Sequence, residues 1–224
     1  MAKTVLIAGA SRGIGLEMAR QAKARGDRVI AMVRSANVAS ALDGIADEVM
    51  VADVTDEASL ARAADKSDTP IDLLICNAGV YRGRGGIDAP DSGLEAWQDV
   101  LTTNVAGPFL VSRAFLPRIA AAKGKIAVVS SKMGSSARSP GGAYLYRASK
   151  AAATNLACNL AAELKPQGVA VGAYHPGWVR TEMGGAEADL TVEESAAGLL
   201  ARFDALSMET SGLFEDYAGE AIPF

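Results

Sequence analysis

The stretch "TVLIAGASRGIG", residues 4–15, joins an apolar, β-branched run to three glycines. The run predicts a short buried strand, and apolar residues of the stretch that follows recur at helical spacing up to Gly26. The glycines permit a tight turn between the two, and the N-terminus of the helix offers free N–H groups and a positive dipole end. The sequence therefore predicts a strand, a turn and a helix that together form an anion site.

Strand-like and helix-like runs alternate through the rest of the chain. The strand-like runs lie at 28–33, 47–54, 71–79, 124–131 and 168–177, and the helix-like runs at 56–66, 93–119 and 144–165. Near-continuous apolar strands that alternate with helices are typical of a parallel sheet covered on both faces. We predict a doubly wound α/β fold in a single domain over residues 1–224. Pro117 is expected to end or kink the helix that begins near Leu94.

Two segments rich in glycine and short polar residues, 81–93 and 182–190, follow the carboxyl ends of predicted strands. Ligands bind at the carboxyl ends of strands in doubly wound folds. We expect these segments to line a substrate pocket, and ordinary surface connections are the alternative.

The composition excludes several classes of function. The 224 residues include 22 Lys and Arg against 26 Asp and Glu, and the net charge of −4 argues against a nucleic-acid surface. No run approaches the roughly 18 apolar residues of a membrane helix, and the N-terminus lacks a cleavage site, so we expect a cytoplasmic protein with no membrane partner. His175 is the only histidine, and Cys76 and Cys158 lie far apart, so we expect no metal site and two small buried thiols.

Residues 9–13 also match the GxSxG motif, which in serine hydrolases places the nucleophile between a strand and a helix. Ser11 would be the nucleophile, and an aspartate and His175 follow in the hydrolase order. The nucleophile of hydrolases normally follows a central strand with several strands before it, whereas only eight residues precede Gly9. We therefore disfavour a serine hydrolase.

A tyrosine and a lysine stand at the head of the helix-favouring run "AYLYRASKAAATNLA", residues 143–157. Residues four apart share a helix face, so Tyr146 and Lys150 can meet, whereas Tyr144 has Ala148 at its fourth position. A phenol with a pKa near ~10 delivers a proton efficiently only if its pKa is brought toward the working pH, and a nearby ammonium does this. The pair predicts a general acid, with Tyr144 as pocket wall or packing. An ordinary surface helix is the alternative for this spacing taken alone.

These motifs and several others occur in the order and at the spacings of one enzyme family. The matching pieces are "GASRGIG" (9–15), "DV" (53–54), "NAG" (77–79), "NVAG" (104–107), "SS" (130–131), "YRASK" (146–150) and "HPGWVRTEM" (175–183). On these residues the chain resembles the short-chain dehydrogenase/reductase family over essentially its whole length. The compact length and the ending "GLFEDYAGEAIPF" look most like its C-factor and sniffer-type carbonyl reductase branch. The resemblance implies a Rossmann fold and an NAD(P)-dependent oxidoreductase.

The resemblance implies four catalytic residues. Tyr146 is similar to the general acid/base of the family, and Lys150 to the lysine that holds the nicotinamide ribose and lowers the pKa of the tyrosine. Ser131 is similar to the serine that bonds the substrate oxygen, and Asn104 to the asparagine that holds a water of the proton relay. Ser130 is the alternative to Ser131, because a one-residue shift of the strand would exchange their faces.

The resemblance also implies a dinucleotide site. The glycine turn would cradle the pyrophosphate, residues after the third and fourth strands would meet the adenosine, and the segment from 176 would seat the nicotinamide. The residues so implied are Gly9, Ser11, Arg12, Gly13, Ile14, Gly15, Arg34, Asp53, Val54, Asn77, Ala78, Gly79, Tyr146, Lys150, Pro176, Gly177, Val179 and Thr181.

The charges near the second strand predict which cofactor is used. A carboxylate at the end of that strand selects NAD(H) by binding the ribose hydroxyls, and cations select NADP(H) by binding the extra phosphate. Here the strand ends at Val33-Arg34 without an acid, and Arg12 adds a second guanidinium. The sequence predicts NADP(H) over NAD(H), and two solvated surface arginines are the alternative.

We therefore expect an NADPH-dependent reductase that converts an aldehyde or ketone to an alcohol, with a small-molecule substrate and no nucleic-acid partner. Oxidation of an alcohol with NAD(P) and a dinucleotide-binding signalling role are the alternatives. The apolar substrate wall would comprise Tyr81, Met133, Tyr144, Trp178 and Met183, and His175 is expected to pack or bond locally behind the cofactor. Family members usually assemble through the helices beginning near residues 93 and 144, which implies a homodimer or homotetramer.

Overall fold

The computed structural model describes residues 2–66 and 68–224 and places their strands in one parallel sheet. The strands are β1 (Thr4–Ala8), β2 (Arg28–Val33), β3 (Glu48–Val51), β4 (Leu73–Cys76), β5 (Lys125–Val129), β6 (Ala170–His175) and β7 (Phe214–Asp216). They pair in the order β3-β2-β1-β4-β5-β6-β7, and every pairing between them is parallel. The predicted doubly wound α/β fold is confirmed.

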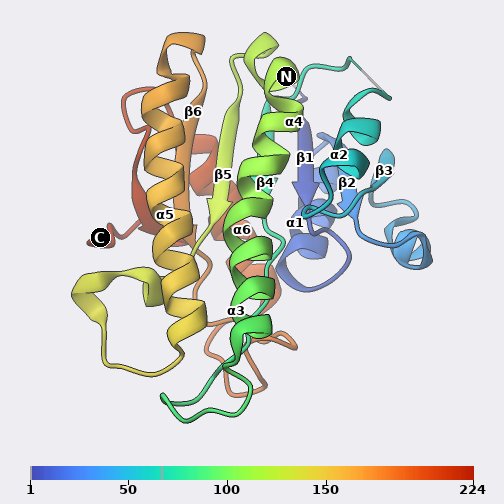
Figure 1. The fold of residues 1–224 in the computed structure, drawn as a ribbon. Helices are drawn as coiled ribbons and strands as arrows, with labels where there is room; N and C mark the ends of the chain where they lie inside the picture. Colours follow the sequence, from blue (N-terminus) through green and yellow to red (C-terminus); the bar gives the residue numbers. More distant parts are fainter. Residues whose placement is uncertain (1, 67) are drawn as a thin grey trace.

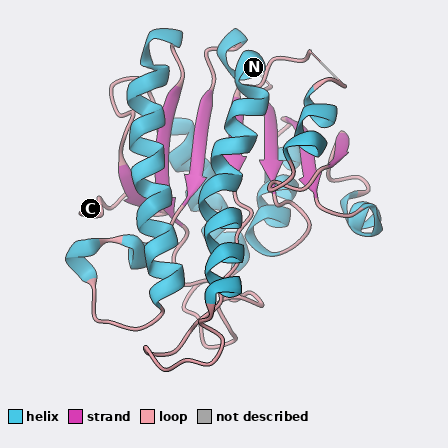
Figure 2. Cartoon of the chain, in the orientation of Figure 1, coloured by secondary structure: helices cyan, strands magenta, loops and turns pink. Residues whose placement is uncertain are grey.

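Helices cover both faces of the sheet, as Figures 1 and 2 show. The helices are α1 (Gly13–Ala24), α2 (Glu57–Ala64), α3 (Leu94–Leu101), α4 (Gly107–Ala121), α5 (Tyr144–Leu164) and α6 (Val192–Ala205). A π-helical turn at Thr102–Ala106 joins α3 to α4, and short 3-10 turns lie at Ala36–Leu42, Lys132–Gly134, Ser136–Arg138 and Lys165–Gln167.

The alternation of side chains along each strand divides the core into two layers. On one face, α1 and α6 pack through residues such as Met18 and Phe203 against the sheet. On the other face, α2, α4 and α5 pack through residues such as Leu60, Phe115 and Leu160. A sheet buried on both faces needs near-continuous apolar strands, which explains why the strand-like runs are apolar at successive positions.

The chain reverses its direction of travel across the sheet between β3 and β4. It proceeds outward from β1 to β2 and β3, and then returns to place β4 on the other side of β1. The connections that follow β1 and β4 therefore leave in opposite directions and open a crevice at the carboxyl end of these strands, where such folds bind ligands. The glycine turn that follows β1 lies at this crevice.

Two predictions about secondary structure were wrong or incomplete. Pro117 does not end its helix, because α4 continues to Ala121; the irregularity lies earlier, at the π-helical turn Thr102–Ala106. Pro117 stands near the end of α4, where only the bond to the Arg113 carbonyl is lost, and tight packing of α4 on the sheet holds the helix. The helix α6 and the strand β7 were not anticipated.

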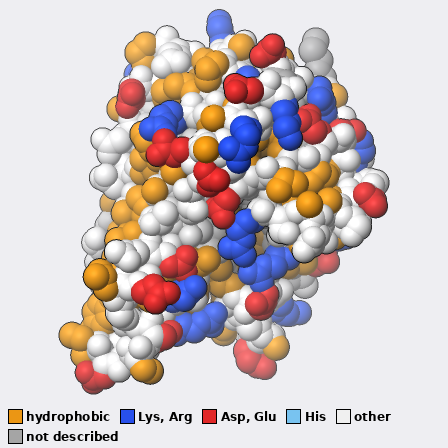
Figure 3. All heavy atoms as spheres, turned by 45° about the vertical axis from the view of Figure 1, so that its right-hand side comes forward, with side chains coloured by type: hydrophobic (Ala, Val, Ile, Leu, Met, Phe, Trp, Pro, Cys, Tyr) orange, Lys and Arg blue, Asp and Glu red, His pale blue; other side chains and the backbone are white. Residues whose placement is uncertain are grey.

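The face of the molecule in Figure 3 shows no concentration of one charge. On the face in Figure 3, basic and acidic side chains are interspersed, in agreement with the small net charge of −4. None of the helices within residues 2–66 and 68–224 combines the length and the apolar character that a membrane-spanning segment requires.

Candidate active site

The glycine turn is packed so closely that two of its positions leave no room for the Cβ of any other residue. A Cβ at Gly15 would overlap the carbonyl oxygen of Gly9 and would lie 2.5 Å from Asn77 Nδ2. Gly9 has φ +89°, a region that favours glycine, and a Cβ there would meet the backbone of Ala78 at 2.7 Å. Asn77 Nδ2 donates to the Gly9 carbonyl at 2.9 Å. Three predicted cofactor residues thus hold one another in place across β1 and β4.

The N-terminus of α1 is free to receive an anion. Arg12 precedes the helix in an extended conformation and no side chain caps it, and the first helical bond runs from Leu16 N–H to the Arg12 carbonyl. The N–H groups of the first turn, beginning at Gly13, have no partner within the helix and remain for a ligand. Thr181 lies opposite, since a Cβ at Gly13 would stand 3.5 Å from its methyl group. The segment expected to seat the nicotinamide therefore faces the glycine turn.

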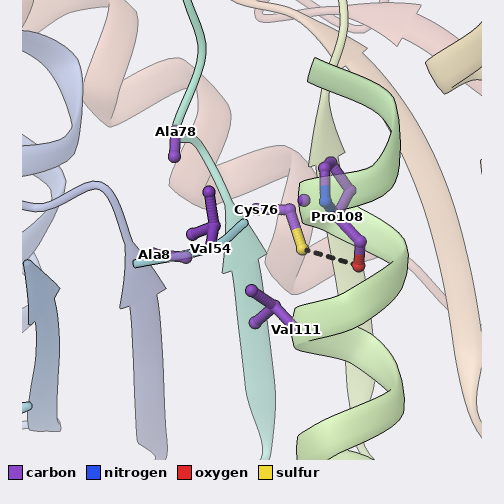
Figure 4. A pocket seen from close by; sticks show the side chains of 7 residues that line it. Ala8, Val54, Cys76, Ala78, Pro108 and Val111 are labelled. Atoms are coloured by element: carbon purple, nitrogen blue, oxygen red, sulfur yellow. Dashed lines mark hydrogen bonds between the residues drawn. The ribbon is translucent and has the colours of Figure 1, made fainter. Parts of the chain in front are cut away.

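A narrow apolar gap lies beside the predicted adenosine region, between β1, β4 and α4 (Figure 4). It is lined by small residues, namely Ala8, Val54, Cys76, Ala78, Gly107, Pro108 and Val111. The Cys76 thiol points toward α4 and donates to the Pro108 carbonyl at 3.9 Å. Burial raises the pKa of Cys76 to about 12, so this thiol is unreactive at neutral pH.

The carboxylate of Asp53 is held by its own turn. Its Oδ1 accepts bonds from the Thr55 N–H at 2.9 Å and from the Thr55 hydroxyl at 2.8 Å. Val54 follows and packs against Gly107, where an added Cβ would lie 3.1 Å from the valine Cγ2. These contacts give the stretch after β3 a defined conformation at the crevice.

Tyr146 and Lys150 meet on the buried side of α5. Tyr146 is 9% exposed, and Lys150 Nζ lies 5.6 Å from the centroid of its ring. Tyr144 is 45% exposed and stands on the outer side of the helix. Lys150 Nζ donates to the Val129 carbonyl at 2.8 Å. The structure therefore pairs the lysine with the tyrosine four residues before it, as predicted from helical spacing.

The structure corrects the expected pKa of the tyrosine. Burial raises the pKa of Tyr146 to about 12, and hydrogen bonding to the Ser131 side chain opposes this rise. Burial also lowers the pKa of Lys150 to about 8. Loss of water penalises the charged form of both groups, and this penalty outweighs the attraction expected between ammonium and phenolate. The pair without ligand thus favours a neutral phenol, the form that can donate a proton.

The structure distinguishes between the two serines at the end of β5. The Ser130 hydroxyl lies 2.6 Å from Thr154 Oγ1 and donates to the Lys150 carbonyl at 3.0 Å, so it is used within the packing against α5. Ser131 interacts with the phenol of Tyr146 and accepts a bond from the Met133 N–H at 3.1 Å. Ser131, the first choice from the sequence, is the serine beside the tyrosine.

Asn104 lies in the π-helical turn between α3 and α4, next to Lys150. Its amide N–H groups donate to the Val80 carbonyl at 2.9 Å and to the Ser149 hydroxyl at 3.0 Å, and its Oδ1 accepts from the Val80 N–H at 2.8 Å. A Cβ at Gly79 would lie 3.2 Å from Asn104 Oδ1 and 3.7 Å from Lys150 Nζ. Asn104 therefore fixes the chain after β4 and keeps a second lone pair of Oδ1 beside the lysine.

The two segments expected to line the substrate pocket meet above Tyr146. The Tyr81 ring stacks on the Tyr146 ring with centroids 4.2 Å apart, and the Arg84 guanidinium lies 4.5 Å from the Tyr81 centroid. Arg84 Nη2 donates to the Met183 carbonyl at 2.8 Å. The three side chains form a stack, which we call the Tyr81–Arg84 stack, and it joins segment 81–93 to segment 182–190.

Segment 81–93 also holds the start of α5. Ala143, just before α5, has φ +48°, and its N–H donates to the Gly85 carbonyl at 2.8 Å. On the other side, Gly134 allows the chain after Ser131 to approach α5, because a Cβ there would lie 2.6 Å from the Lys150 carbonyl carbon. Neither contact was anticipated, since neither has a local sequence signal.

The two arginines expected to select NADP(H) have different environments. Arg34 is exposed just after β2, and the sequence around it supplies no carboxylate. Arg12 forms an ion pair with Glu182, and both side chains are largely exposed. The sequence expected no acid at the end of β2, and none lies there in the sequence; at the glycine turn, the tertiary fold brings a glutamate from segment 182–190 to Arg12.

The serine hydrolase alternative is wrong. Ser11 follows β1 and His175 ends β6, and β4 and β5 lie between these strands. Three strand spacings separate the two residues by roughly 14 Å, too far for a nucleophile and its base. His175 is 7% exposed, and neither of its ring nitrogens has a hydrogen-bond partner among the described residues. It packs, as expected, but it does not bond locally.

The sheet order, the free helix N-terminus and the Ser131, Tyr146 and Lys150 cluster define a dinucleotide-dependent oxidoreductase. The short chain dehydrogenase family model matches residues 3–190. The chain is 40% identical over 160 residues to the C-signal protein of Myxococcus xanthus, covering 69% of this chain and 93% of that one. It therefore belongs to the short-chain dehydrogenase/reductase family and is an NAD(P)-dependent oxidoreductase.

Solved structures of carbonyl reductases share the whole fold. The NADPH-bound carbonyl reductase from chicken fatty liver has a TM-score of 0.91 and 33% identity, with 100% of this chain and 99% of that chain covered. The carbonyl reductase Sniffer of D. melanogaster has a TM-score of 0.93 and 25% identity, with both chains fully covered. A carbonyl reductase from Pseudomonas aeruginosa has a TM-score of 0.85 and 34% identity, also with full coverage. The predicted resemblance to this branch is confirmed.

Proposed function

We propose that this protein reduces an aldehyde or ketone to an alcohol with NADPH, using Tyr146 as the general acid. The observation that carries the proposal is the buried contact of Tyr146 with Ser131 and Lys150 at the crevice that follows β1 and β4. This cluster combines the neutral phenol of Tyr146 with the Ser131 hydroxyl and the buried Lys150 ammonium. Such a combination is suited to protonating a substrate oxygen that gains negative charge.

The residues at the crevice fit a dinucleotide. The uncapped N-terminus of α1 would hold the pyrophosphate beside Gly13, where no side chain obstructs the backbone. Asp53, Val54 and Asn77 would contact the adenosine, and the chain from Gly177 to Thr181 would hold the nicotinamide. Gly177 has φ +87°, a region that favours glycine, and a Cβ there would also displace the Leu190 side chain. When bound, the cofactor supplies the hydride.

Two observations favour NADPH over NADH. The chain after β2 offers the exposed guanidinium of Arg34 and no acid, and Arg12 stands at the glycine turn. In addition, the similar chicken carbonyl reductase is described with NADPH, and a similar Burkholderia multivorans protein with NADP. Glu182 competes for Arg12, so the ion pair between them has to open for Arg12 to bind a phosphate.

In the proposed mechanism, each polar side chain has one task. The Ser131 hydroxyl donates a hydrogen bond to the carbonyl oxygen and stabilises the negative charge that develops there. Tyr146 transfers its phenolic proton to this oxygen. Lys150, beside the phenol, would hold the ribose and stabilise the phenolate that remains. Asn104 keeps the backbone after β4 in place and offers its free lone pair to a water that resupplies the proton.

The decisive experiment follows NADPH oxidation at 340 nm with a panel of aldehydes and ketones, with NADH in parallel. Tyr146→Phe should abolish turnover, whereas Tyr144→Phe, on the exposed side of the same helix, should retain it. Equal activity of Tyr146→Phe and wild type would refute the proposal. Turnover only in the direction of alcohol oxidation would instead support the dehydrogenase alternative, and binding of NADPH without any turnover would support a signalling role.

The remaining expectations belong to the same proposal. Segments 81–93 and 182–190 would cover the substrate, and residues 1–224 would act as one catalytic domain. Leu94 and Leu101 on α3 and Phe109 on α4 are exposed apolar residues. Their position agrees with assembly into a homodimer or homotetramer through these helices and α5. The cytoplasmic location stays a prediction.

A further inference from the structure

A cavity of about 250 Å³ lies between the chain that follows Ser131 and the C-terminal residues that follow β7. We call it the tail cavity. Its walls include His175, Trp178, Tyr217, Lys132 and Glu220. Neither Ser131 nor Tyr146 lines it, yet Lys132 directly follows Ser131 in the chain. The tail cavity is thus separate from Ser131 and Tyr146, although its lining begins one residue after Ser131, and its volume is just below that of typical small-ligand sites.

His175 is a buried polar group without a protein partner at this cavity. The residue is 7% exposed, and neither Nδ1 nor Nε2 has a hydrogen-bond partner among the described residues. Burial and the nearby Lys132 lower the pKa of His175 to about 4, so the ring is neutral at pH 7 and offers one donor and one acceptor. Buried polar groups are normally satisfied, and this one can be satisfied only from the cavity or by water.

The charged groups around the tail cavity are of both signs. Lys132 and Arg138 supply two cations, while Asp189 and Glu220 supply two exposed carboxylates. A third carboxylate, that of Asp216, accepts bonds from the Ala218 and Glu220 N–H groups and is already used by its own turn. An anion would meet the carboxylates and a cation would meet the bases. Neutral hydroxyl groups can donate hydrogen bonds to the carboxylates and accept hydrogen bonds from Lys132 and Arg138.

Aromatic surface accompanies these polar groups. Trp178 is 47% exposed, and its indole N–H already donates to the Gly184 carbonyl at 2.8 Å, so the ring contributes apolar area to the cavity. Tyr217, which follows β7, is half-buried and also lines the cavity. Apolar surface combined with donors and acceptors of both kinds suits a carbon chain or ring that carries several hydroxyl groups.

We propose that the tail cavity binds the polyhydroxylated part of a carbonyl substrate, through His175 and the charged groups at its rim. This inference rests on the proposed function, since it assigns the substrate class of the same site. A hydroxylated ketone with its carbonyl oxygen at Ser131 would extend past Lys132 into the cavity. The hydroxyl groups would then occupy the donor and acceptor of the imidazole.

The binding test uses His175 as its own reporter, because it is the only histidine in the chain. The imidazole nitrogen signals of the protein without cofactor are recorded by NMR during titration with sorbitol, with succinate and with choline. Sorbitol should shift the signals in a saturable manner, and Glu220→Gln and Trp178→Leu should each weaken this binding several-fold. No shift with sorbitol, or a stronger saturable response to either charged probe, would overturn the inference.

A kinetic test separates this inference from the proposed function. Erythrulose and 2-butanone share one carbon skeleton and differ in three hydroxyl groups, so they form a matched pair of ketones. We expect kcat/KM with NADPH to favour erythrulose by about tenfold or more, and His175→Asn to remove most of this preference while reduction of 2-butanone persists. Reduction of both ketones without preference would refute the inference and leave the proposed function standing. Sorbitol binding without reduction of any carbonyl would refute the proposed function instead.

Discussion

The glycine turn and the two segments above Tyr146 are held in contrasting ways. The turn is fixed by backbone groups in direct contact, since Gly9, Gly15 and Asn77 leave no room for another atom between them. Segments 81–93 and 182–190 are joined to each other and to the glycine turn by side chains, through the Tyr81–Arg84 stack and the exposed ion pair of Arg12 and Glu182. A cofactor site built from close-packed backbone tolerates little change, whereas a cover held by exposed side chains can open at small cost.

The largest expected effect comes from adding one methyl group to the turn. Gly15→Ala would place a Cβ against the Gly9 carbonyl, and forced overpacking of this kind costs on the order of 3 kcal/mol. We expect a markedly lower Tm and loss of NADPH binding, measured by thermal unfolding and cofactor fluorescence. Gly86→Ala is the matched control, because nothing lies within 4 Å of a Cβ at that position. Unchanged stability and binding in Gly15→Ala would show that the turn is not rigid.

A second prediction concerns pH. Burial lowers the pKa of His175 to about 4, below the 6.5 of an unfolded histidine; Lys132, Arg138 and Lys150 also oppose its protonation, while Asp216 favours it. The unfolded chain therefore binds more protons than the folded one between these values, so stability is complete above pH 6.5 and falls as the pH decreases. From pH 7 to pH 5 the loss should be about 2 kcal/mol.

Urea unfolding of wild type and His175→Asn at these two pH values checks this prediction. The variant should lose about 2 kcal/mol less than the wild type over the same interval, since carboxylates contribute mainly below pH 5. An equal pH dependence of the two proteins would show that His175 is not buried in its neutral form. The result would also report on the tail cavity independently of any ligand.

The Tyr81–Arg84 stack should affect catalysis more than stability. Arg84 lowers the pKa of Tyr146, although burial has the larger and opposite influence. Arg84→Gln should therefore move the basic limb of the pH profile of kcat/KM to higher pH, with little change in Tm. Arg82→Gln is the control, because Arg82 pairs with Asp99 at 2.6 Å instead. The same shift in both variants would mean that the effect is a general loss of positive charge.

The smallest effect is expected at the exposed ion pair. Glu182→Gln frees Arg12 for a phosphate, and exposed pairs of this kind contribute little, so NADPH should bind about two- to fivefold more tightly while NADH binding stays the same. Fluorescence titration of the two cofactors measures both constants, and Glu187→Gln in the same segment is the control. Equal tightening for NADH would show that Glu182 does not act on the phosphate.

Much of the fold was predictable because its signals are local. Apolar strands that alternate with helices predicted the parallel sheet. The spacing of four residues predicted that Tyr146, and not Tyr144, meets Lys150 on one face of the helix. The strand β7 was missed because it spans only Phe214–Asp216, too short for a recognisable pattern. The π-helical turn at Asn104 was missed because its residues have ordinary helical spacing, and contacts with Val80 and Ser149 decide its geometry.

The sequence by itself determined the fold class, the glycine turn and the pairing of Tyr146 with Lys150, because each is signalled by residues close together in the chain. Only the tertiary structure decided between Ser130 and Ser131 and brought Glu182 to Arg12. It also buried the His175 ring at a cavity, where neither ring nitrogen has a hydrogen-bond partner among the described residues. It also reversed the expected direction of the Tyr146 pKa shift. The physical reason is the same in each case: burial and contacts between distant segments set the energy of a charge or a hydrogen bond, and neither can be read from spacing along one element.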